Sequence, residues 1–418
     1  MEAQEIFIKL LEPAGIDNPY PLYAAVHQLG EVLPAGGGLI PGGGQMMLVP
    51  AYEVANAVLR DPGYIVPDAA FLDQVRPGWR EHPSLDANNL LTLNGDDHSR
   101  IRTLITKHFT RRRVAELEPA VVRLTDGLLD AIADEGADGS AVDFMQQFAF
   151  ALPVTVICEL IGVPVSLRGE FRPLARALVL TLEPLIDAEG LAVADVAALK
   201  LADMFAELIA ERRAAPADDL LSAIVQAGDA EPGRITDVEL IQNLILLLVA
   251  GFETTTNLLG NGVCLVLDGA GTDPGRKSEL IGGLMAGEAA AAAFVEEVLR
   301  FDSPVQFTGD RRPTSPKVVG GVNVTPDDHL VVMIGAANRD PKRFAEPDRF
   351  WPERPDAGPL SFGGGAHFCV GAALARLEGT VAFPRLFARF PGLASAGPPE
   401  RRNGIVLRGF EHLPVTLS

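Results

Sequence analysis

The feature that most constrains this chain is a glycine-rich stretch around a single cysteine, Phe362–Gly371, which reads Phe-Gly-Gly-Gly-Ala-His-Phe-Cys-Val-Gly. Three consecutive glycines allow a tight turn and let the backbone approach a large flat group closely. Good helix formers follow in Ala372–Glu378, so Cys369 is expected where a loop enters a helix. Amide N–H groups at a helix start stabilise a thiolate, the form of cysteine that binds metal. Cys369 is therefore either a metal ligand or an ordinary loop cysteine.

The composition narrows the class of protein. The chain has 418 residues, and 48% of them are hydrophobic, which is typical of a globular protein with a large core. Because 55 acidic residues face 35 basic ones, the net charge is −20, which disfavours a general nucleic-acid binder. Three cysteines are too few for a disulfide framework, and Cys158 and Cys264 lie in apolar runs where we expect core packing.

Nothing in the sequence resembles a membrane anchor or a signal peptide. The N-terminus is acidic and is followed by only a short apolar piece. The longest strongly apolar run, Leu244–Phe252, is nine residues long, whereas about 20 residues are needed to span a bilayer. We therefore expect a soluble, cytoplasmic protein that binds neither membranes nor nucleic acid.

The periodicity predicts many helices and a few short strands, and the length alone suggests two or three domains. Residues 114–230 have apolar side chains at helical spacing, and a capping-box pattern at 236–239 opens a long, buried helix to about Leu267. Strand signals are confined to about 46–50, 317–334 and 404–417, the last as a final hairpin. Residues 269–287 are glycine-rich, and we expect irregular structure there. Residues 61–93 have no clear period, and a loop of that length is usually functional.

The long helix has an unusual centre. A carboxylate, Glu253, and three threonines that begin at Thr254 follow Gly251 in a helix that should be buried. Buried polar groups are costly without partners, although a threonine hydroxyl can bond back to the carbonyl one turn earlier. The segment is therefore either a bend with satisfied hydroxyls or a chemical site.

Two further pairs have helical spacing. His98 and Arg102 are four apart, and Glu297 and Arg300 are three apart, so each pair shares one helix face. Taken alone, the first pair fits a solvated helix with cations and the second fits a common surface ion pair.

Together these motifs resemble the cytochrome P450 superfamily, and specifically its soluble bacterial haem–thiolate monooxygenases. The loop matches Phe-Gly-x-Gly-x-His-x-Cys-x-Gly at every fixed position, and Ala250–Thr254 matches Ala-Gly-x-Asp/Glu-Thr. A His-x-x-x-Arg, a Glu-x-x-Arg and an arginine before a hairpin stand in the family's order. The resemblance runs from about residue 90 to 380, which is most of the chain. It implies a mainly α fold with a small β lobe, in one domain over residues 1–418.

The resemblance implies haem b with Cys369 as the axial thiolate and sole protein ligand to iron, in a loop closed by Gly371. His98, Arg102 and His367 would contact the haem propionates. Either Arg311 or Arg312 would do the same, and the spacing to Gly320 favours Arg311. The long helix would cross the distal haem face.

Two more roles follow from the resemblance. Gly251 would give room for dioxygen, and Glu253 and Thr254 would deliver protons to it. Glu297 and Arg300 would form a buried ionic network whose third member is Arg349.

The implied reaction inserts one oxygen atom from O₂ into a small apolar organic substrate, by hydroxylation or epoxidation. Electrons would come from a ferredoxin and its reductase. A docking surface for this acidic partner is expected at Lys107, Arg111, Arg112, Arg113 and Arg376, because this cationic run stands out in an acidic chain. The loops at 61–93 and 165–192 should hold the information on substrate identity.

Several alternatives remain open at this point. The same haem–thiolate site could use peroxide or catalyse oxidative coupling. A non-catalytic haem sensor or carrier is a second alternative, but Glu253 and Thr254 argue against it because binding alone needs no proton relay. A cysteine hydrolase built on Cys369 and His367 is the most distant, since it lacks a clear third group.

Overall fold

The computed structural model describes residues 1–37, 44–75, 78–184, 186–231, 233–272 and 274–417. The chain forms two compact units. Unit 1 comprises Met1–Ile65, Ala115–Leu152 and Thr254–Ser418, and unit 2 comprises Val66–Val114 and Pro153–Glu253. Both units are rich in helices and the strands are short, so the expected mainly α class with a small β part is confirmed.

Unit 2 is built almost entirely from helices. They are α5 (Ala69–Val75), α6 (Gly95–Thr106), α9 (Arg168–Val179), α10 (Ala188–Ala214) and α11 (Leu220–Ala230), with short 3₁₀ turns η1 (Trp79–Glu81), η2 (Pro83–Leu85), η4 (Val165–Leu167) and η5 (Leu180–Leu182). Aspartates cap two of the helices: Asp187 accepts from the amide of Gly190 at α10, and Asp219 accepts from the amide of Ser222 at α11. Such caps satisfy amides that a helix start leaves unbonded.

The remaining helices lie in unit 1 or are shared. Those of unit 1 are α1 (Ala3–Leu10), α2 (Pro13–Asp17), α3 (Tyr20–Leu29), α4 (Tyr52–Arg60), α13 (Pro274–Leu284), α14 (Glu288–Phe301), α15 (Ile334–Ala337), α16 (Ala372–Arg389), the 3₁₀ turn η6 (Gly365–His367) and the π-helical turn η3 (Met145–Ala149). Those with residues in both units are α7 (Arg111–Glu135), α8 (Ala151–Ile161) and α12 (Asp237–Thr272).

The predicted capping box opens α12. The amide of Thr236 donates to the Glu239 carboxylate at 2.8 Å, and the amide of Glu239 donates back to the Thr236 hydroxyl at 3.2 Å. This reciprocal pair fixes where the longest helix begins. By length and composition alone, the Asp237–Leu267 part of α12 could cross a membrane. However, half of its most apolar 18-residue stretch is buried within the protein, and buried core helices can be equally long and apolar.

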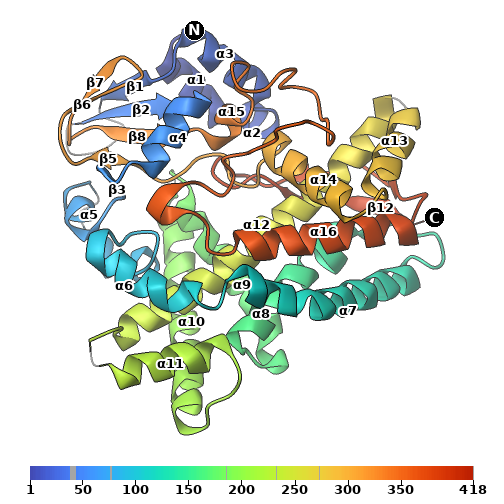
Figure 1. Cartoon of the computed structure of the whole chain (residues 1–418), viewed down its shortest axis with the longest axis horizontal. Helices are drawn as coiled ribbons and strands as arrows, with labels where there is room; N and C mark the ends of the chain where they lie inside the picture. Colours follow the sequence, from blue (N-terminus) through green and yellow to red (C-terminus); the bar gives the residue numbers. More distant parts are fainter. Residues whose placement is uncertain (38–43, 76–77, 185, 232, 273, 418) are drawn as a thin grey trace. The chain divides into compact units, whose positions relative to one another are not determined.

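In unit 1, α14 and α16 pack closely, as Figure 1 shows. A Cβ at Gly379 of α16 would lie 2.9 Å from the Val295 side chain, so the helices can approach this closely only because residue 379 has no side chain. The rings of Phe294 and Phe383 meet edge to face at 5.0 Å between centroids. This pair of helices forms the support behind the cysteine loop, because α16 begins directly after it.

The largest β element of unit 1 joins strands that are far apart in sequence. β1 (Leu33–Gly37), β2 (Gln45–Val49) and β8 (His329–Val332) form a sheet in that order, with β1 antiparallel and β8 parallel to β2 (Figure 1). Both faces of β2 are buried: Met47 and Val49 pack in one hydrophobic cluster, and Met46 and Leu48 pack in another. This alternation follows from the two-residue period of a strand.

The other strands pair in small sheets. They are β3 (Tyr64–Ile65) with β5 (Arg312–Pro313), β6 (Lys317–Val319) with β7 (Val322–Val324), β10 (Glu400–Arg401) with β11 (Phe410–His412), and β12 (Pro414–Thr416) between β4 (Val142–Asp143) and β9 (Ala394–Ser395). The hairpin predicted around Gly320 and Gly321 is confirmed. Both glycines have positive φ, 53° and 80°, as a tight hairpin turn requires.

Two local predictions are wrong. The strands expected at 404–417 exist, but β11 and β12 do not form a hairpin with each other, because a single residue, Leu413, separates them and that is too short for a turn. Within 269–287, the described residues are mostly helical rather than irregular. Pro274 stands at the first position of α13, where a missing N–H costs nothing. The hairpin prediction rests on local composition, whereas the pairing of strands depends on their tertiary partners.

Candidate functional site

The cysteine loop (Phe362–Gly371) lies in unit 1 and is held by its own backbone. The amide of Cys369 donates to the carbonyl of Phe362 at 2.9 Å, and the amide of Gly363 donates to the carbonyl of Leu360 at 2.8 Å. Gly363 and Gly365 have φ of 68° and 65°, a region that favours glycine. A Cβ at Gly365 would also collide with the carbonyl of Leu59 at the end of α4. The loop is therefore tightly defined.

Cys369 lies at the loop-to-helix junction that the sequence predicts. Gly371 is the N-cap of α16, which begins at Ala372, and Cys369 is exposed and not part of a disulfide. Cys158 and Cys264 are buried, as expected of core residues. Burial raises the pKa of the Cys158 thiol to about 12, so this cysteine stays protonated and is a poor metal ligand.

The surroundings of Cys369 do not supply a complete metal site. Within the ranges that the structure describes, no group of three or more His, Cys, Asp or Glu side chains could hold a metal ion. The haem expected from the resemblance needs no such group, because a porphyrin supplies four nitrogen ligands and the protein supplies the axial thiolate.

Arg311 is the second notable group of unit 1. It is only 9% exposed, and its Nη1 donates to the carbonyl oxygens of Gly309 and Asp310 at 3.2 and 3.1 Å. Burial lowers the pKa of Arg311 to about 10, although the neighbouring Asp310 partly opposes this shift. A desolvated guanidinium is suited to an anionic ligand, such as a propionate.

Arg312, the alternative to Arg311, has a different environment. Its Nε and Nη2 both donate to the carbonyl of Pro326, at 3.2 and 2.9 Å. The backbone of Arg311 exchanges two hydrogen bonds with Leu330 of β8, which fixes where its side chain starts. Both arginines thus donate to backbone carbonyls, and the expected role of Arg311 at a propionate stays a prediction.

In unit 2, His98 and Arg102 lie on α6 as the spacing predicts. His98 is 3% exposed, and burial together with the nearby Arg102 lowers the pKa of its imidazole. This histidine is therefore neutral at pH 7 and carries a single ring N–H. Unit 1 holds the other predicted donor, His367, as the last residue of η6 and two residues before Cys369.

The centre of α12 is polar and buried. Glu253 and Thr255 are each 2% exposed, and Asn257 is fully buried. The Thr256 hydroxyl and both amide atoms of Asn257 have no hydrogen-bond partner among the described residues. Because unsatisfied buried groups are costly, this segment points to bound water or a ligand rather than to ordinary core.

Gly251 has a role that the sequence did not predict. A Cβ at this position would lie 2.7 Å from the Ile157 side chain of α8, so α12 can pack on α8 within unit 2 only because residue 251 is glycine. The expected role of Gly251 in leaving room for dioxygen stays a prediction. Thr254, unlike its buried neighbours Glu253 and Thr255, is only partly buried.

The ionic network is built around Glu297, and its third member is not Arg349. Glu297 and Arg300 are both fully buried and form two hydrogen bonds of 2.8 Å. Arg354 donates to the same carboxylate at 3.3 Å, and the amide of Trp351 donates at 2.8 Å. The buried carboxylate of Glu297 therefore has hydrogen-bond donors from three different residues.

The prediction of Arg349 as a side-chain partner is wrong. Its side chain is half exposed and pairs with Glu346 at 3.3 Å. Arg349 contributes its backbone carbonyl instead, which accepts hydrogen bonds from both Arg300 and Arg354. The only signal for Arg354 in the sequence is a second arginine five residues later, and spacing alone does not distinguish the two.

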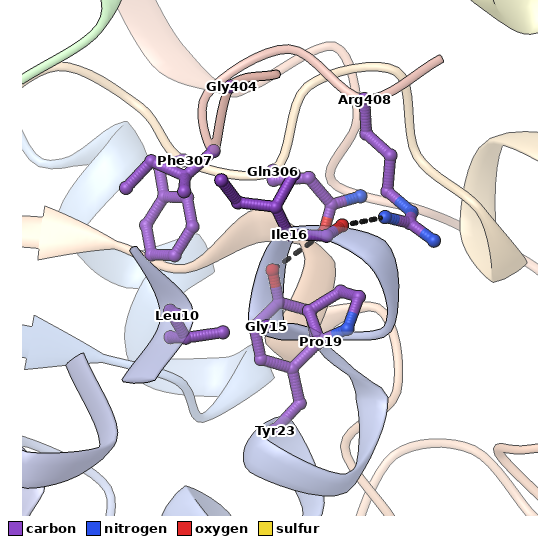
Figure 2. Close-up of a pocket in the computed structure, with 10 residues that line it drawn as sticks. Leu10, Gly15, Ile16, Pro19, Tyr23, Gln306, Phe307, Gly404 and Arg408 are labelled. Atoms are coloured by element: carbon purple, nitrogen blue, oxygen red, sulfur yellow. Dashed lines mark hydrogen bonds between the residues drawn. The ribbon is translucent and has the colours of Figure 1, made fainter. Parts of the chain in front are cut away.

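A pocket in unit 1 is lined by none of the predicted site residues, and Figure 2 shows the residues that do line it. Arg408 donates to the carbonyl of Ile16 at 2.7 Å, and the Tyr23 hydroxyl donates to Gln306 at 2.7 Å. Arg408 also binds the buried Asp302. These bonds tie the N-terminal helices to the C-terminal part of the chain, so we interpret this pocket as structural.

Comparison with known proteins gives a consistent answer. A family model described as "Cytochrome P450" matches residues 291–406, which include Glu297, Arg300 and the cysteine loop. The protein named "Cytochrome P450 107B1" from Saccharopolyspora erythraea is 41% identical over 382 residues, which cover 88% of each chain. The chain belongs to the cytochrome P450 family.

A second relative and a solved structure extend this likeness within the P450 family. The "6-deoxyerythronolide B hydroxylase" of the same organism is 37% identical and covers 89% of this chain and 90% of its own. The crystal structure of Mycobacterium smegmatis CYP164A2 with econazole bound has a TM-score of 0.85 at 33% identity and covers 99% of this chain and 100% of that one. The protein is thus a P450 monooxygenase whose cofactor is haem b with a cysteine thiolate ligand. The P450 resemblance of the sequence is confirmed.

Proposed function

We propose that the protein uses O₂ to hydroxylate or epoxidise a small apolar organic substrate in the cytoplasm, as one domain and with electrons from a ferredoxin-type partner. Membership of the P450 monooxygenase family supports this assignment, and one relative is named as a hydroxylase of 6-deoxyerythronolide B. The observation that carries it is Cys369, an exposed thiol at a loop–helix junction with no complete set of protein metal ligands around it in the described ranges.

The haem would be held by the axial cysteine and by cationic and histidine side chains. Cys369 would bind the iron, and Arg311, His98, Arg102 and His367 would donate to the propionates. The buried guanidinium of Arg311 supports its role, because an anionic partner would offset its desolvation. When bound, the haem supplies the chemistry of dioxygen activation, and the thiolate favours O–O cleavage.

The chain's own residues would handle protons and shape. Glu253 is buried in α12 beside the partly buried Thr254, so a proton can be held at the carboxyl and passed through the threonine hydroxyl. The unsatisfied groups at Thr256 and Asn257 one turn later would bind water that refills this relay. The glycines at 363 and 365 would keep the loop backbone close to the haem.

An acidic ferredoxin would dock on the exposed side chains of Arg111, Arg112 and Arg113, with Lys107 nearby in sequence. Opposite charges steer such encounters and lose their effect as salt screens them. Arg376, also expected in this surface, forms an ion pair with Glu296 and stacks on the Phe362 ring at 4.4 Å. Because that pair neutralises its charge, Arg376 should contribute little to docking.

Two experiments test the proposal. A screen of apolar compounds for substrate-type shifts of the haem spectrum would define the substrate class, with econazole as a positive control for azole binding. Product formation is then measured with O₂ and reduced ferredoxin, and separately with hydrogen peroxide. Turnover that needs peroxide and ignores ferredoxin would contradict the monooxygenase assignment with ferredoxin, and spectral binding without any product would favour a sensor or carrier.

A further inference from the structure

Phe362, the first residue of the cysteine loop, sets the position of the backbone at Cys369. Its carbonyl accepts the hydrogen bond from the Cys369 amide at 2.9 Å. A shift of Phe362 would therefore be passed directly to the cysteine. The Phe362 side chain is only partly buried, so core packing alone does not fix its ring.

Arg376 of α16 covers this ring. Its Cζ lies 4.4 Å from the centroid of the Phe362 ring, within the range in which a cation is attracted to an aromatic face. On the same loop, the ring of Phe368 lies at a tilt to that of Phe362, with 6.5 Å between the two centroids. The first residue of the loop is thus in contact with the helix that follows the loop.

Glu296 of α14 in turn orients Arg376. Both Nε and Nη2 of Arg376 donate to the Glu296 carboxylate, one to each oxygen, and the second bond measures 3.1 Å. Because a guanidinium is planar, two such bonds fix its plane as well as its position. The side chains of Arg376 and Glu296 are 38% and 26% exposed, so salt screens this pair less than it would screen a fully exposed one.

The helix that carries Glu296 is firmly held. The next residue, Glu297, is fully buried and bonded to Arg300 and Arg354. Consecutive carboxylates of α14 therefore have different partners, Glu297 in the buried network and Glu296 on α16. Since α14 also packs closely on α16 (Figure 1), Glu296 and Arg376 have little freedom to separate.

We propose that Glu296 and Arg376 form a clamp that positions Phe362 and, through its carbonyl, the amide of Cys369, and that this clamp sets the reduction potential of the haem iron. Both are positioning residues, since they act through Phe362 and not on the reacting atoms. The effect on iron rests on the proposed role of Cys369, whereas the clamp itself does not. Arg376 has this role in place of the docking role expected from the sequence, because Glu296 compensates its charge.

The direction of the effect follows from the charge on the sulfur. Hydrogen bonds to a ligating thiolate withdraw negative charge from the sulfur and raise the reduction potential of the iron. In the clamped loop, the Cys369 amide is bonded to the Phe362 carbonyl. When the clamp is broken, this amide can turn toward the sulfur. Loss of either clamp residue should therefore make the potential more positive.

The test compares Arg376→Gln with Arg385→Gln in the holoenzyme. Both arginines lie on α16 in an ion pair, and their side chains are 38% and 39% exposed, but Arg385 pairs with Asp126 of α7. Arg376→Gln should shift the ferric–ferrous equilibrium toward ferrous about tenfold, the effect of one hydrogen bond, which corresponds to about 59 mV. Arg385→Gln should leave the potential at the wild-type value.

Amide hydrogen exchange measures the clamp itself, without reference to the iron. Exchange at the Cys369 amide should rise about tenfold in Arg376→Gln, because its bond to the Phe362 carbonyl opens more often. A double variant tests the route of the effect. With Phe362→Leu in place, adding Arg376→Gln should change neither the exchange rate nor the potential any further.

Arg376→Lys separates the clamp from docking. Lysine keeps the positive charge, but it lacks the planar fork that bonds both oxygens of Glu296 while covering the ring. This variant should shift the potential as Arg376→Gln does, while the salt dependence of reduction by ferredoxin stays that of wild type.

The outcomes separate the possibilities. If Arg376→Gln equals Arg385→Gln in exchange and potential, the clamp is refuted, and faster exchange with an unchanged potential would refute its role at the iron. If Arg376→Lys keeps the wild-type potential, the charge of residue 376 matters rather than the clamp, and the proposal fails.

Should Arg376→Gln fold poorly, Glu296→Gln keeps the shape of the other clamp residue and must shift exchange and potential in the same direction by a smaller factor. Absence of a haem–thiolate spectrum in wild type would overturn the proposed function and the effect on iron, while exchange would still decide the clamp.

Discussion

The cysteine loop and residues 79–94 of unit 2, called here the 79–94 segment, are both irregular backbone, yet they are held by different interactions. The loop relies on its own backbone hydrogen bonds, on two glycines with positive φ and on close contact with the end of α4. Residues 79–94 are held by Asn94 at their own end and by two side chains from outside, the buried Asn243 and the partly exposed Asp195. A single conformation suits a thiolate that binds iron, whereas side-chain hydrogen bonds to a partly exposed carboxylate can exchange with water.

The difference also concerns what a mutation does. In the cysteine loop, a change at Gly365 would meet both backbone strain and a collision with Leu59. In the segment, a change at Asp195 removes hydrogen bonds that water can replace. We therefore expect changes in the supports of the loop to be far more damaging than changes in the segment.

The largest effect is expected at the buried network in unit 1. Glu297→Ala leaves Arg300 and Arg354 as buried cations without their carboxylate, which typically costs about 3–5 kcal/mol. Little haem-loaded protein should be recovered, as measured by haem content and thermal melting.

Two arginines serve as matched controls for this prediction. Arg354→Ala removes a buried donor to Glu297 and should lower the melting temperature clearly, whereas Arg349→Ala removes an exposed ion pair with Glu346 that is worth about 0–1 kcal/mol. Equal melting temperatures for the two variants would show that the network does not support the fold as described.

Proton delivery should show the next largest effect. Thr254→Ala removes a hydroxyl beside the buried Glu253, and a positioned proton donor typically contributes roughly 10²–10⁴-fold in rate. The variant should still bind substrate and consume reductant, but electrons should leak into peroxide. The measurement is product formed per reductant oxidised, with Thr254→Ser as the control that keeps the hydroxyl.

An unchanged product ratio in Thr254→Ala would rule out the proton role. Lost substrate binding with intact coupling would also contradict it, because the residue would then act on the pocket. Either result would show that Thr254 does not deliver protons as proposed.

A smaller effect is expected at the exposed arginines Arg111, Arg112 and Arg113. Changes there should leave the cysteine loop and residues 79–94 intact. Changing Arg112 and Arg113 together to Glu should slow reduction by ferredoxin about tenfold or more at low salt, since steering depends on opposite charges. Substrate affinity and peroxide-driven turnover should not change, because neither requires docking. If reduction rates stay equal to those of wild type, and wild type shows no salt dependence, the partner docks elsewhere.

Much of the site could be predicted because its signals are local. Three glycines and one cysteine define the loop, and the pair Glu297 and Arg300 needs only helical spacing. The hairpin at Gly320 and Gly321 is equally local, since the turn requires positive φ at both residues. Such local patterns can be interpreted without knowledge of the rest of the fold.

Other features depend on tertiary partners and could not be predicted. Arg354 replaces Arg349 because the path of the 347–354 loop, not its composition, decides which guanidinium points inward. β12 pairs with β4, more than 270 residues earlier in the chain. Asp195 bonds to His82 and Ser84, which lie more than 110 positions earlier in the chain, and no short sequence motif predicts these bonds.

The central claim is that Cys369 supplies the thiolate to haem iron, and one spectrum tests it most directly. Wild type, reduced and saturated with carbon monoxide, should show the red-shifted Soret band of a haem–thiolate protein. Cys369→Ser should abolish this band, while Cys158→Ala and Cys264→Ala should keep it, because those two thiols are buried. Survival of the band in Cys369→Ser, or its loss in either of the other two variants with haem still bound, would contradict the account.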